Sequence, residues 1–200
     1  MNPETEEETV LSLRFEAALI YAARLHQHQR RKITGVPYIC HLLAVAALVI
    51  EAGGCEDSAI AALLHDAIED QGGSATRLEI EKQFGAQVAN WVQACSARHK
   101  TEGESWRSHK RSYLAKVSAA PLAVKQIVLA DKLHNGRALL ANLSRFGPEA
   151  WSAFSGSPSD ILWFYQSCCE LLSDSQLNTR SLLEVTTQIE SLQKSAKIKR

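Results

Sequence analysis

The chain has 200 residues, which is enough for one domain with a sizeable core. Hydrophobic residues make up 46% and charged residues 22%, the balance of an ordinary soluble protein. Lysine plus arginine equal aspartate plus glutamate at 22 each, so the net charge indicates neither a nucleic acid nor a membrane as a partner. Any binding of anions must therefore come from local clusters of charge.

Two further features of the composition indicate where the protein works. The amino terminus is acidic, and no apolar run approaches the roughly 18 residues that a membrane helix needs. The five cysteines are odd in number and none has the Cys-x-x-Cys spacing, which argues against a disulfide framework or a structural zinc site. Reduced thiols are typical of a cytoplasmic protein, and we expect that location. A role for Cys40 as ligand or nucleophile is disfavoured, because it adjoins His41 and adjacent helical residues face different ways.

The first half of the chain has a helical apolar pattern. Apolar residues recur at three- and four-residue steps from Leu11 to Leu25, the spacing of an amphipathic helix. Gly35 and Pro37 follow in a polar segment and indicate a loop. The glycine pairs at 53–54 and 72–73 are expected to end two more apolar helices. The expected bounds of these three helices are about 11–25, 41–52 and 57–70.

The middle of the chain continues in the same way. Thr76 and Glu79 have the spacing of a capping box and predict the start of a fourth helix, which Gly85 separates from a fifth at about 86–97. The polar segment 98–111 is expected to begin as a loop, and its basic residues at 98–100 and 107–111 are expected to lie at the protein surface. Pro121 indicates the start of the next helix, which is expected to cover about 124–143.

The last third predicts two more helices. Ser157, Pro158 and Asp160 have the residue types of an N-cap, a first and a third helical position. A final helix at about 182–193 leads into a basic tail, and no alternating strand pattern with hairpin turns occurs. We therefore predict an all-α fold, with a single helical domain over 11–195 between an acidic tail at 1–10 and a basic tail at 196–200.

Four ionisable residues end the third expected helix, directly after the apolar stretch AIAALL. They are His65, Asp66, Glu69 and Asp70. Helical spacing would place His65 beside Glu69, and Asp66 beside both carboxylates that follow. Burying so many ionisable groups is costly unless a cation offsets their charge. The alternative is a solvated, acidic helix end.

His41 and Asp131 are the other candidate ligands. Asp131 follows a second apolar stretch, IVLA, and shares a helical face with Asn135. The alternatives are a surface ion pair with Lys132 or Lys125 for Asp131, and a helix-start or core position for His41. For His134, a position as a partly buried histidine is favoured over a contact to a metal-binding residue or to a bound nucleotide.

Two histidines with two aspartates form a donor set of nitrogen and oxygen. Such donors suit Mn²⁺, Fe²⁺ or Zn²⁺ better than Ca²⁺. An ion of this kind can lower the pKa of a bound water to near neutrality. Glu69 and Asp70 would then be at hand, one to orient the water and the other to protonate a leaving oxygen.

A basic segment precedes His41. Arg30, Arg31 and Lys32 are three successive cations that could hold phosphates, and an arginine plane can stack on a purine base. The alternative is a solvated loop.

Three motifs in order resemble a known family. The strings QRRKITGVPYICH, LLHDAIED and LADKLHN resemble the HD hydrolase domain of the RelA/SpoT family, from about residue 17 to about 150. The chain is expected to lack a synthetase domain and is similar to the stand-alone small alarmone hydrolases. These remove the 3′-pyrophosphate of guanosine tetraphosphate and pentaphosphate, usually with Mn²⁺. The resemblance thus implies a helical HD-domain bundle with this activity.

The resemblance also implies roles for individual residues. The implied metal ligands are His41, His65, Asp66 and Asp131, the catalytic carboxylates Glu69 and Asp70, and the nucleotide contacts Arg31, Lys32 and Asn135. The chain departs from the family at Leu42, where proline is usual, and at Gly136, where a larger apolar residue is common. Because Gly136 is expected to border the nucleotide pocket, this departure bears on base specificity. The helix with Trp163 and Tyr165 is expected to pack in the core rather than to close that pocket.

Other functions stay open. The adenosine analogue of the alarmone and the 2′-phosphate of NADPH are rival substrates. A non-catalytic nucleotide sensor is disfavoured by the intact pair of Glu69 and Asp70. A phosphodiesterase acting on a cyclic nucleotide or a nucleic acid is disfavoured by the neutral net charge. We expect one nucleotide as the partner, with neither nucleic acid nor membrane, and the sequence leaves the oligomeric state open.

Overall fold

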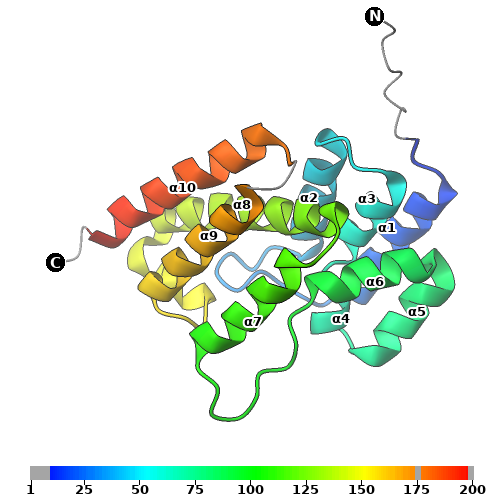
Figure 1. The fold of residues 1–200 in the computed structure, drawn as a ribbon, viewed down its shortest axis with the longest axis horizontal. Coiled ribbons are helices and arrows are strands. Elements are labelled where there is room, and N and C mark those ends of the chain that lie inside the picture. The colour runs from blue at the N-terminus through cyan, green and yellow to red at the C-terminus, as the bar shows by residue number, and fades with distance from the viewer. Residues whose placement is uncertain (1–9, 174–176, 198–200) are drawn as a thin grey trace, which may run out of the picture.

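The computed structural model of the protein describes residues 10–173 and 177–197. In these two ranges the chain folds into helices and contains no strand, so the predicted all-α fold is confirmed (Figure 1). Residues 1–9 and 198–200 of the two predicted tails lie outside the described residues, and the domain bounds stay a prediction. No described helix is both long enough and apolar enough to cross a membrane.

The longest connections between the helices are residues 26–38 and 96–105. In chain order they are α1 (Leu13–Leu25), α2 (Ile39–Glu51), α3 (Glu56–Leu63), α4 (Ala67–Asp70), α5 (Ser74–Phe84), α6 (Ala86–Cys95), α7 (Trp106–Ser118), α8 (Leu122–Phe146), a 3₁₀ helix η1 (Gly147–Ala153), α9 (Pro158–Ser173) and α10 (Thr179–Lys197). The segment before α7 is a loop, as expected, and Ser105 caps α7 by accepting a hydrogen bond from the Ser108 N–H (3.1 Å).

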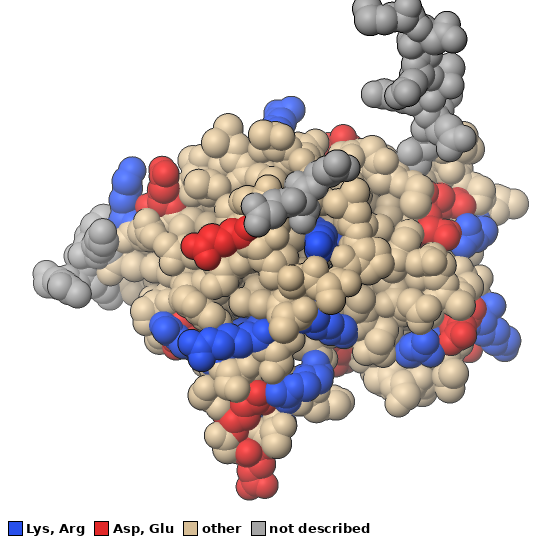
Figure 2. Space-filling model, in the orientation of Figure 1, with Lys and Arg blue, Asp and Glu red and all other residues tan. Residues whose placement is uncertain are grey.

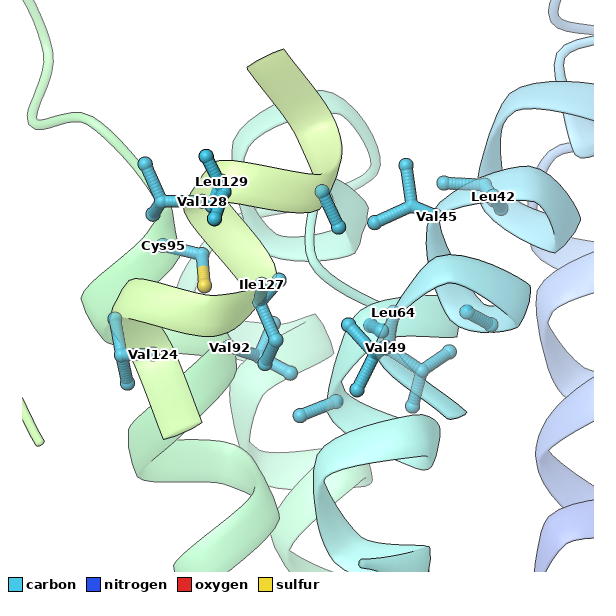
Figure 3. Close-up of a cluster of buried hydrophobic side chains, with 14 of the residues drawn as sticks. Leu42, Val45, Val49, Leu64, Val92, Cys95, Val124, Ile127, Val128 and Leu129 are labelled. Carbon is cyan, nitrogen blue, oxygen red and sulfur yellow. The ribbon is translucent and has the colours of Figure 1, made fainter. Parts of the chain in front are cut away.

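Helix α8 joins the two parts of the molecule. It contacts α2, α3 and α6 from the first half of the chain and α9 and α10 from the second. In Figure 1 the first group lies to the right, and α9 and α10 lie to the left. Figure 3 shows the core where α8 meets α2, with Val45 and Val49 on one side and Ile127 on the other, all fully buried. Each such side chain stabilises the fold by about 1.5–3 kcal/mol.

The chain breaks its helix at the His-Asp motif, so the prediction of one helix over 57–70 is wrong. Helix α3 ends at Leu63, and α4 starts only at Ala67. The physical reason is that the His65 side chain competes with the backbone N–H groups for a carbonyl oxygen of α3. The Nδ1 atom of His65 hydrogen-bonds to the carbonyl oxygen of Ala62 at 2.7 Å. The Ala67 N–H donates to the Leu64 oxygen at 2.8 Å, which closes a tighter turn.

Two predicted helix starts have different outcomes. The capping box at Thr76 is wrong, because α5 begins earlier, at Ser74 after Gly73, whose φ of +60° favours glycine. The Thr76 hydroxyl instead donates to the Gln71 carbonyl at 2.6 Å. The cap at Ser157 is confirmed, since its hydroxyl accepts from the Asp160 N–H at 3.2 Å, and an Asp160 carboxylate oxygen accepts from the Ser157 N–H at 3.2 Å.

Helix α10 packs against α8 at Gly136. A Cβ atom added there would lie 2.0 Å from Oε1 of Gln188, which is 5% exposed on α10. The Gln188 Nε2 atom donates to the Leu133 carbonyl at 3.3 Å. Gly136 therefore makes room for α10, and it is not among the residues that line the two cavities described below, although it was expected to border a nucleotide pocket.

Candidate metal centre

The four side chains expected to bind a metal meet at one place. They come from α2 (His41), from the turn after α3 (His65 and Asp66) and from α8 (Asp131). The Nε2 atom of His41 lies 3.1 Å from Oδ1 of Asp131 and 3.6 Å from Oδ2 of Asp66. The Nε2 atom of His65 lies 3.0 Å from the same Asp66 oxygen and 3.8 Å from the same Asp131 oxygen. Ligands about 2 Å from one ion lie about 3 Å apart, so these separations suit a shared ion.

Two buried nitrogen atoms test whether the residues fit a metal. His41 is 1% exposed and His65 is 4% exposed. Neither Nε2 atom has a well-aligned hydrogen-bond partner among the residues that the structure describes. A buried polar atom left in this way is costly. A divalent cation would use both lone pairs together with the carboxylate oxygens, so the donor set fits such an ion.

The surroundings keep both carboxylates charged. Burial opposes the charge of Asp131, but the Lys132 ammonium, 2.5 Å from Oδ2, and the two imidazoles hold the pKa of Asp131 well below its usual value. Burial also opposes the charge of Asp66, and His65 outweighs it, so the pKa of Asp66 is lowered as well. Burial lowers the pKa of His41, which favours the neutral imidazole that a metal needs. Burial opposes the charge of His65 too, but Asp66 and Asp131 outweigh it and raise the pKa of His65, so a metal there would take the place of a proton.

Two residues that were given no role as ligands hold the cluster in place. The Tyr38 hydroxyl donates to Oδ2 of Asp66 at 2.7 Å. The Nδ1 atom of His134 lies 2.8 Å from Nδ1 of His41. Burial, helped by His41 and Arg31, lowers the pKa of His134 to about 4, so its ring is neutral. His134 is partly buried, as expected, but it also contacts the His41 ring, which is the alternative that the sequence disfavoured. Tyr38 could have been noticed from its place just before the helix of His41.

Two cavities meet at the cluster. The smaller, of about 140 Å³, is lined by His65, Asp66 and Asp131 together with Lys110 and Lys132. The larger, of about 550 Å³, is bordered by the three residues expected to contact a nucleotide, namely Arg31, Lys32 and Asn135, and by His41. Tyr38 and Asn135 line both cavities, so the cluster lies at their junction.

Hydrogen bonds connect the larger cavity to the cluster. The Arg31 guanidinium donates to Oδ1 of Asn135 at 2.8 Å, and the Asn135 amide donates to Oδ1 of Asp131. The guanidinium carbon also lies 5.6 Å from the centroid of the Tyr38 ring. Arg31 is thus held from two sides at the border of the larger cavity, with Asn135 between it and the cluster.

Glu69 and Asp70 lie on different sides of the cluster. Glu69 borders the smaller cavity, and its carboxylate accepts a hydrogen bond from the Ala97 N–H at 2.7 Å. Asp70 borders the larger cavity, and its carboxylate accepts from the Gln29 amide at 2.7 Å. Burial raises the pKa of Asp70, although the hydrogen bond from Gln29 opposes this. The turn at 64–66 interrupts the single helix on which these carboxylates were expected to share a face with His65 and Asp66. Glu69 nevertheless lines the smaller cavity with His65 and Asp66, whereas Asp70 lines the larger one.

Helices α7 and α9 close the smaller cavity. Figure 2 shows several lysine and arginine side chains over the region of α7, where a basic surface was expected. Arg107 and Arg111 stack on Trp163 at 5.3 Å and 5.6 Å, but Lys110 lines the smaller cavity and so departs from that expectation. Tyr165 is buried in the core as predicted, and α9 reaches the cavity through Phe164 instead.

Several known proteins are similar to this chain in sequence or in fold. The chain is 39% identical over 138 residues to human guanosine-3′,5′-bis(diphosphate) 3′-pyrophosphohydrolase MESH1, which covers 66% of this chain and 70% of that protein. It is 40% identical over 145 residues to the Xenopus tropicalis protein of the same name, covering 68% and 76%. A solved structure described as a metazoan ortholog of SpoT that hydrolyses ppGpp has a TM-score of 0.74 at 27% identity, covering 92% of this chain and 97% of that one.

A family model described as the HD domain matches residues 18–150. The matched range contains the two histidines and two aspartates of the cluster and most of both cavities. The chain therefore belongs to the HD-domain family.

Proposed function

We propose that the protein is a metal-dependent 3′-pyrophosphohydrolase of guanosine 3′,5′-bis(diphosphate) and related alarmones. The observation that carries the proposal is the cluster of His41, His65, Asp66 and Asp131 at the junction of two cavities, one of which presents Arg31 and Lys32. The names of the similar proteins support the same reaction. The products from guanosine 3′,5′-bis(diphosphate) would be pyrophosphate and guanosine 5′-diphosphate.

The four clustered side chains would hold the ion. We propose Mn²⁺, with Fe²⁺ or Zn²⁺ as the alternatives that the same donors suit. When bound, a divalent ion would lower the pKa of a water and offset the charge of phosphate oxygens. Tyr38 and His134 would keep Asp66 and His41 in the orientation that binding needs, as hydrogen-bonded neighbours of ligands do.

The larger cavity would hold the nucleoside. Arg31 is placed to lay the free face of its guanidinium against a purine, since its other face lies over Tyr38. Lys32 lines the same cavity and would neutralise a 5′-phosphate. Asn135 would fix the distance between Arg31 and Asp131, so that the base and the 3′-phosphate are located together.

The separation of the two carboxylates suggests a role for each. Asp70 lies on the nucleoside side, and its raised pKa favours the protonated form that can give a proton to the departing 3′-oxygen. Glu69 lies on the opposite side and would take a proton from the attacking water. One P–O bond forms from the water, the bond to the 3′-oxygen breaks, and one proton moves on each side.

The test is a comparison of substrates. Purified protein with Mn²⁺ is incubated with guanosine tetraphosphate, its adenosine analogue and NADPH, and pyrophosphate is separated from phosphate. We expect pyrophosphate from the guanosine compound. If only the adenosine compound releases pyrophosphate, the preferred base is adenine rather than guanine. If only NADPH reacts, with release of phosphate, the leaving group is phosphate rather than pyrophosphate. If nothing turns over, and Asp66→Ala binds nucleotide as well as the unaltered protein does, the protein is a sensor and the proposal is wrong.

A further inference from the structure

Among the described residues, Lys110 on α7 forms no ion pair with a carboxylate, and the charges of Glu69 and Asp131 act on it only from a greater distance. Its side chain lines the cavity of about 140 Å³ together with His65, Asp66 and Asp131. Within the described part of the chain its ammonium group forms neither an ion pair nor a hydrogen bond. A partly buried ammonium usually has such a partner, because losing water without one is costly. The positive charge of Lys110 is therefore available to an anion that enters the cavity.

Aromatic rings hold this ammonium in position. It lies 5.1 Å from the ring centroid of Phe164, 5.7 Å from that of Trp106 and 5.8 Å from that of Tyr113. Such rings attract a cation but supply no counter-charge. They also limit where the side chain can go, so the ammonium is directed to the cavity.

A second lysine approaches the same ring. The Lys132 ammonium lies 5.3 Å from the Phe164 centroid, and it is paired with Asp131 at 2.5 Å. Lys110 is the one of these two cations that has no such pair. Burial, reinforced by Lys132, lowers the pKa of Lys110. An anion bound between them would offset both the repulsion and the loss of water.

The position of Lys110 relative to the cluster decides which anion fits. Arg31 and Lys32 line the larger cavity, whereas Lys110 borders the smaller one, past Asp66 and Asp131. A nucleotide bound by Arg31 with its 3′-phosphate at the cluster would extend its terminal phosphate towards Lys110. The smaller cavity, at about 140 Å³, is several times the roughly 30 Å³ of one water, and it shares Glu69 and Lys110 with a further hollow of about 660 Å³.

We propose that Lys110 binds the diphosphate group that the reaction releases, as the anion-binding residue of the smaller cavity. The inference rests on the proposed function, because the direction of the substrate follows from it. An ammonium and a phosphate oxygen form a charge-assisted hydrogen bond, which is among the stronger ones in proteins. Lys110 would thus hold the terminal phosphate in the substrate and the pyrophosphate after cleavage.

The experiment measures inorganic pyrophosphate and guanosine 5′-diphosphate separately, by calorimetric titration of the Mn²⁺-loaded protein. Lys110→Met removes the charge and keeps an unbranched side chain, and Lys110→Arg restores a charge. Lys82→Met is the matched control, because Lys82 is an exposed lysine on α5 that borders neither cavity. Thermal unfolding of each variant shows whether it is folded.

We expect Lys110→Met to weaken pyrophosphate binding ten- to a hundredfold, with guanosine 5′-diphosphate binding changed less than twofold. Lys110→Arg should recover part of the loss, and Lys82→Met should behave like the unaltered protein. An equal loss for both ligands, or no loss for pyrophosphate, would overturn the inference. If the unaltered protein cleaves the alarmone while Lys110→Met binds pyrophosphate normally, only this inference fails. If no nucleotide is cleaved but pyrophosphate binding depends on Lys110, only the proposed function fails.

Discussion

The Nδ1 atoms of His41 and His134 lie 2.8 Å apart, so one ring donates a proton to the other. His41 can offer its Nε2 lone pair to a metal only when its proton is on Nδ1. His41 is therefore the donor and His134 the acceptor. The neutral state of His134, with its pKa lowered to about 4, suits this role over the physiological range.

The first prediction concerns this pair. His134→Ala removes the acceptor and leaves the His41 ring free to turn or to change its tautomer. We expect the affinity for Mn²⁺ to fall about 10- to 100-fold, the usual effect of removing a neighbour that orients a ligand. Equilibrium dialysis measures it, and His28→Ala, at an exposed histidine, is the control. Unchanged Mn²⁺ affinity in His134→Ala would show that His41 needs no such partner.

The second prediction concerns stability in the presence of metal. Mn²⁺ at about 100 times its Kd should stabilise the folded chain by about 2.7 kcal/mol, because it binds the native arrangement only. For a chain of this size we expect the Tm to rise by about 5–10 °C, as read from a calorimetric scan. Asp131→Ala should abolish the rise. A rise of the same size in that variant would mean that the ion binds elsewhere.

The third prediction separates the two carboxylates from the ligands. Glu69→Gln and Asp70→Asn should each lower kcat about 10²- to 10⁴-fold, the range for losing a proton-transfer group. Neither side chain belongs to the cluster, which consists of His41, His65, Asp66 and Asp131, so Mn²⁺ affinity should stay within a few fold. Steady-state kinetics and dialysis together make the test. A variant that loses metal and kcat in parallel would have to be counted among the ligands.

The fourth prediction is a double-mutant cycle at the junction of α8 and α10. In Gly136→Ala the new methyl group meets Gln188, which should destabilise the chain by about 1–3 kcal/mol, as overpacking does. In a Gln188→Ala background the clash is gone, and alanine should instead stabilise α8 by up to about 1 kcal/mol. Urea unfolding of the four proteins gives the coupling energy. Additive effects would contradict the contact.

Much of the fold and of the centre could be predicted from local signals. Apolar periodicity and glycine pairs located most of the helices, and Ser157 with Asp160 identified the start of α9. The order of three motifs singled out His41, His65, Asp66 and Asp131 before any distance was known. The helices, the cap and the three motifs are each encoded in a short run of neighbouring residues, which can be recognised in a single sequence.

The features that were not foreseen depend on contacts between distant segments or on competition for a single atom. The break at His65 follows from its ring taking the Ala62 carbonyl, an outcome that helical spacing alone does not predict. Lys110 faces the cavity because α7 packs beside α9, where Phe164 provides a surface. Gly136 could not be understood until α10 placed Gln188 against it.

The two faces of one turn of α8 contact different parts of the molecule. Asp131 and Asn135 face the cavities, while Gly136 and the Leu133 carbonyl receive Gln188 of α10. Shortening the chain from its carboxyl end, or fusing another protein there, thus acts on the other face of the turn that bears Asp131, which we propose to be a metal ligand. We therefore expect the metal content of a shortened or fused protein to report damage to this turn better than the yield of purified protein does.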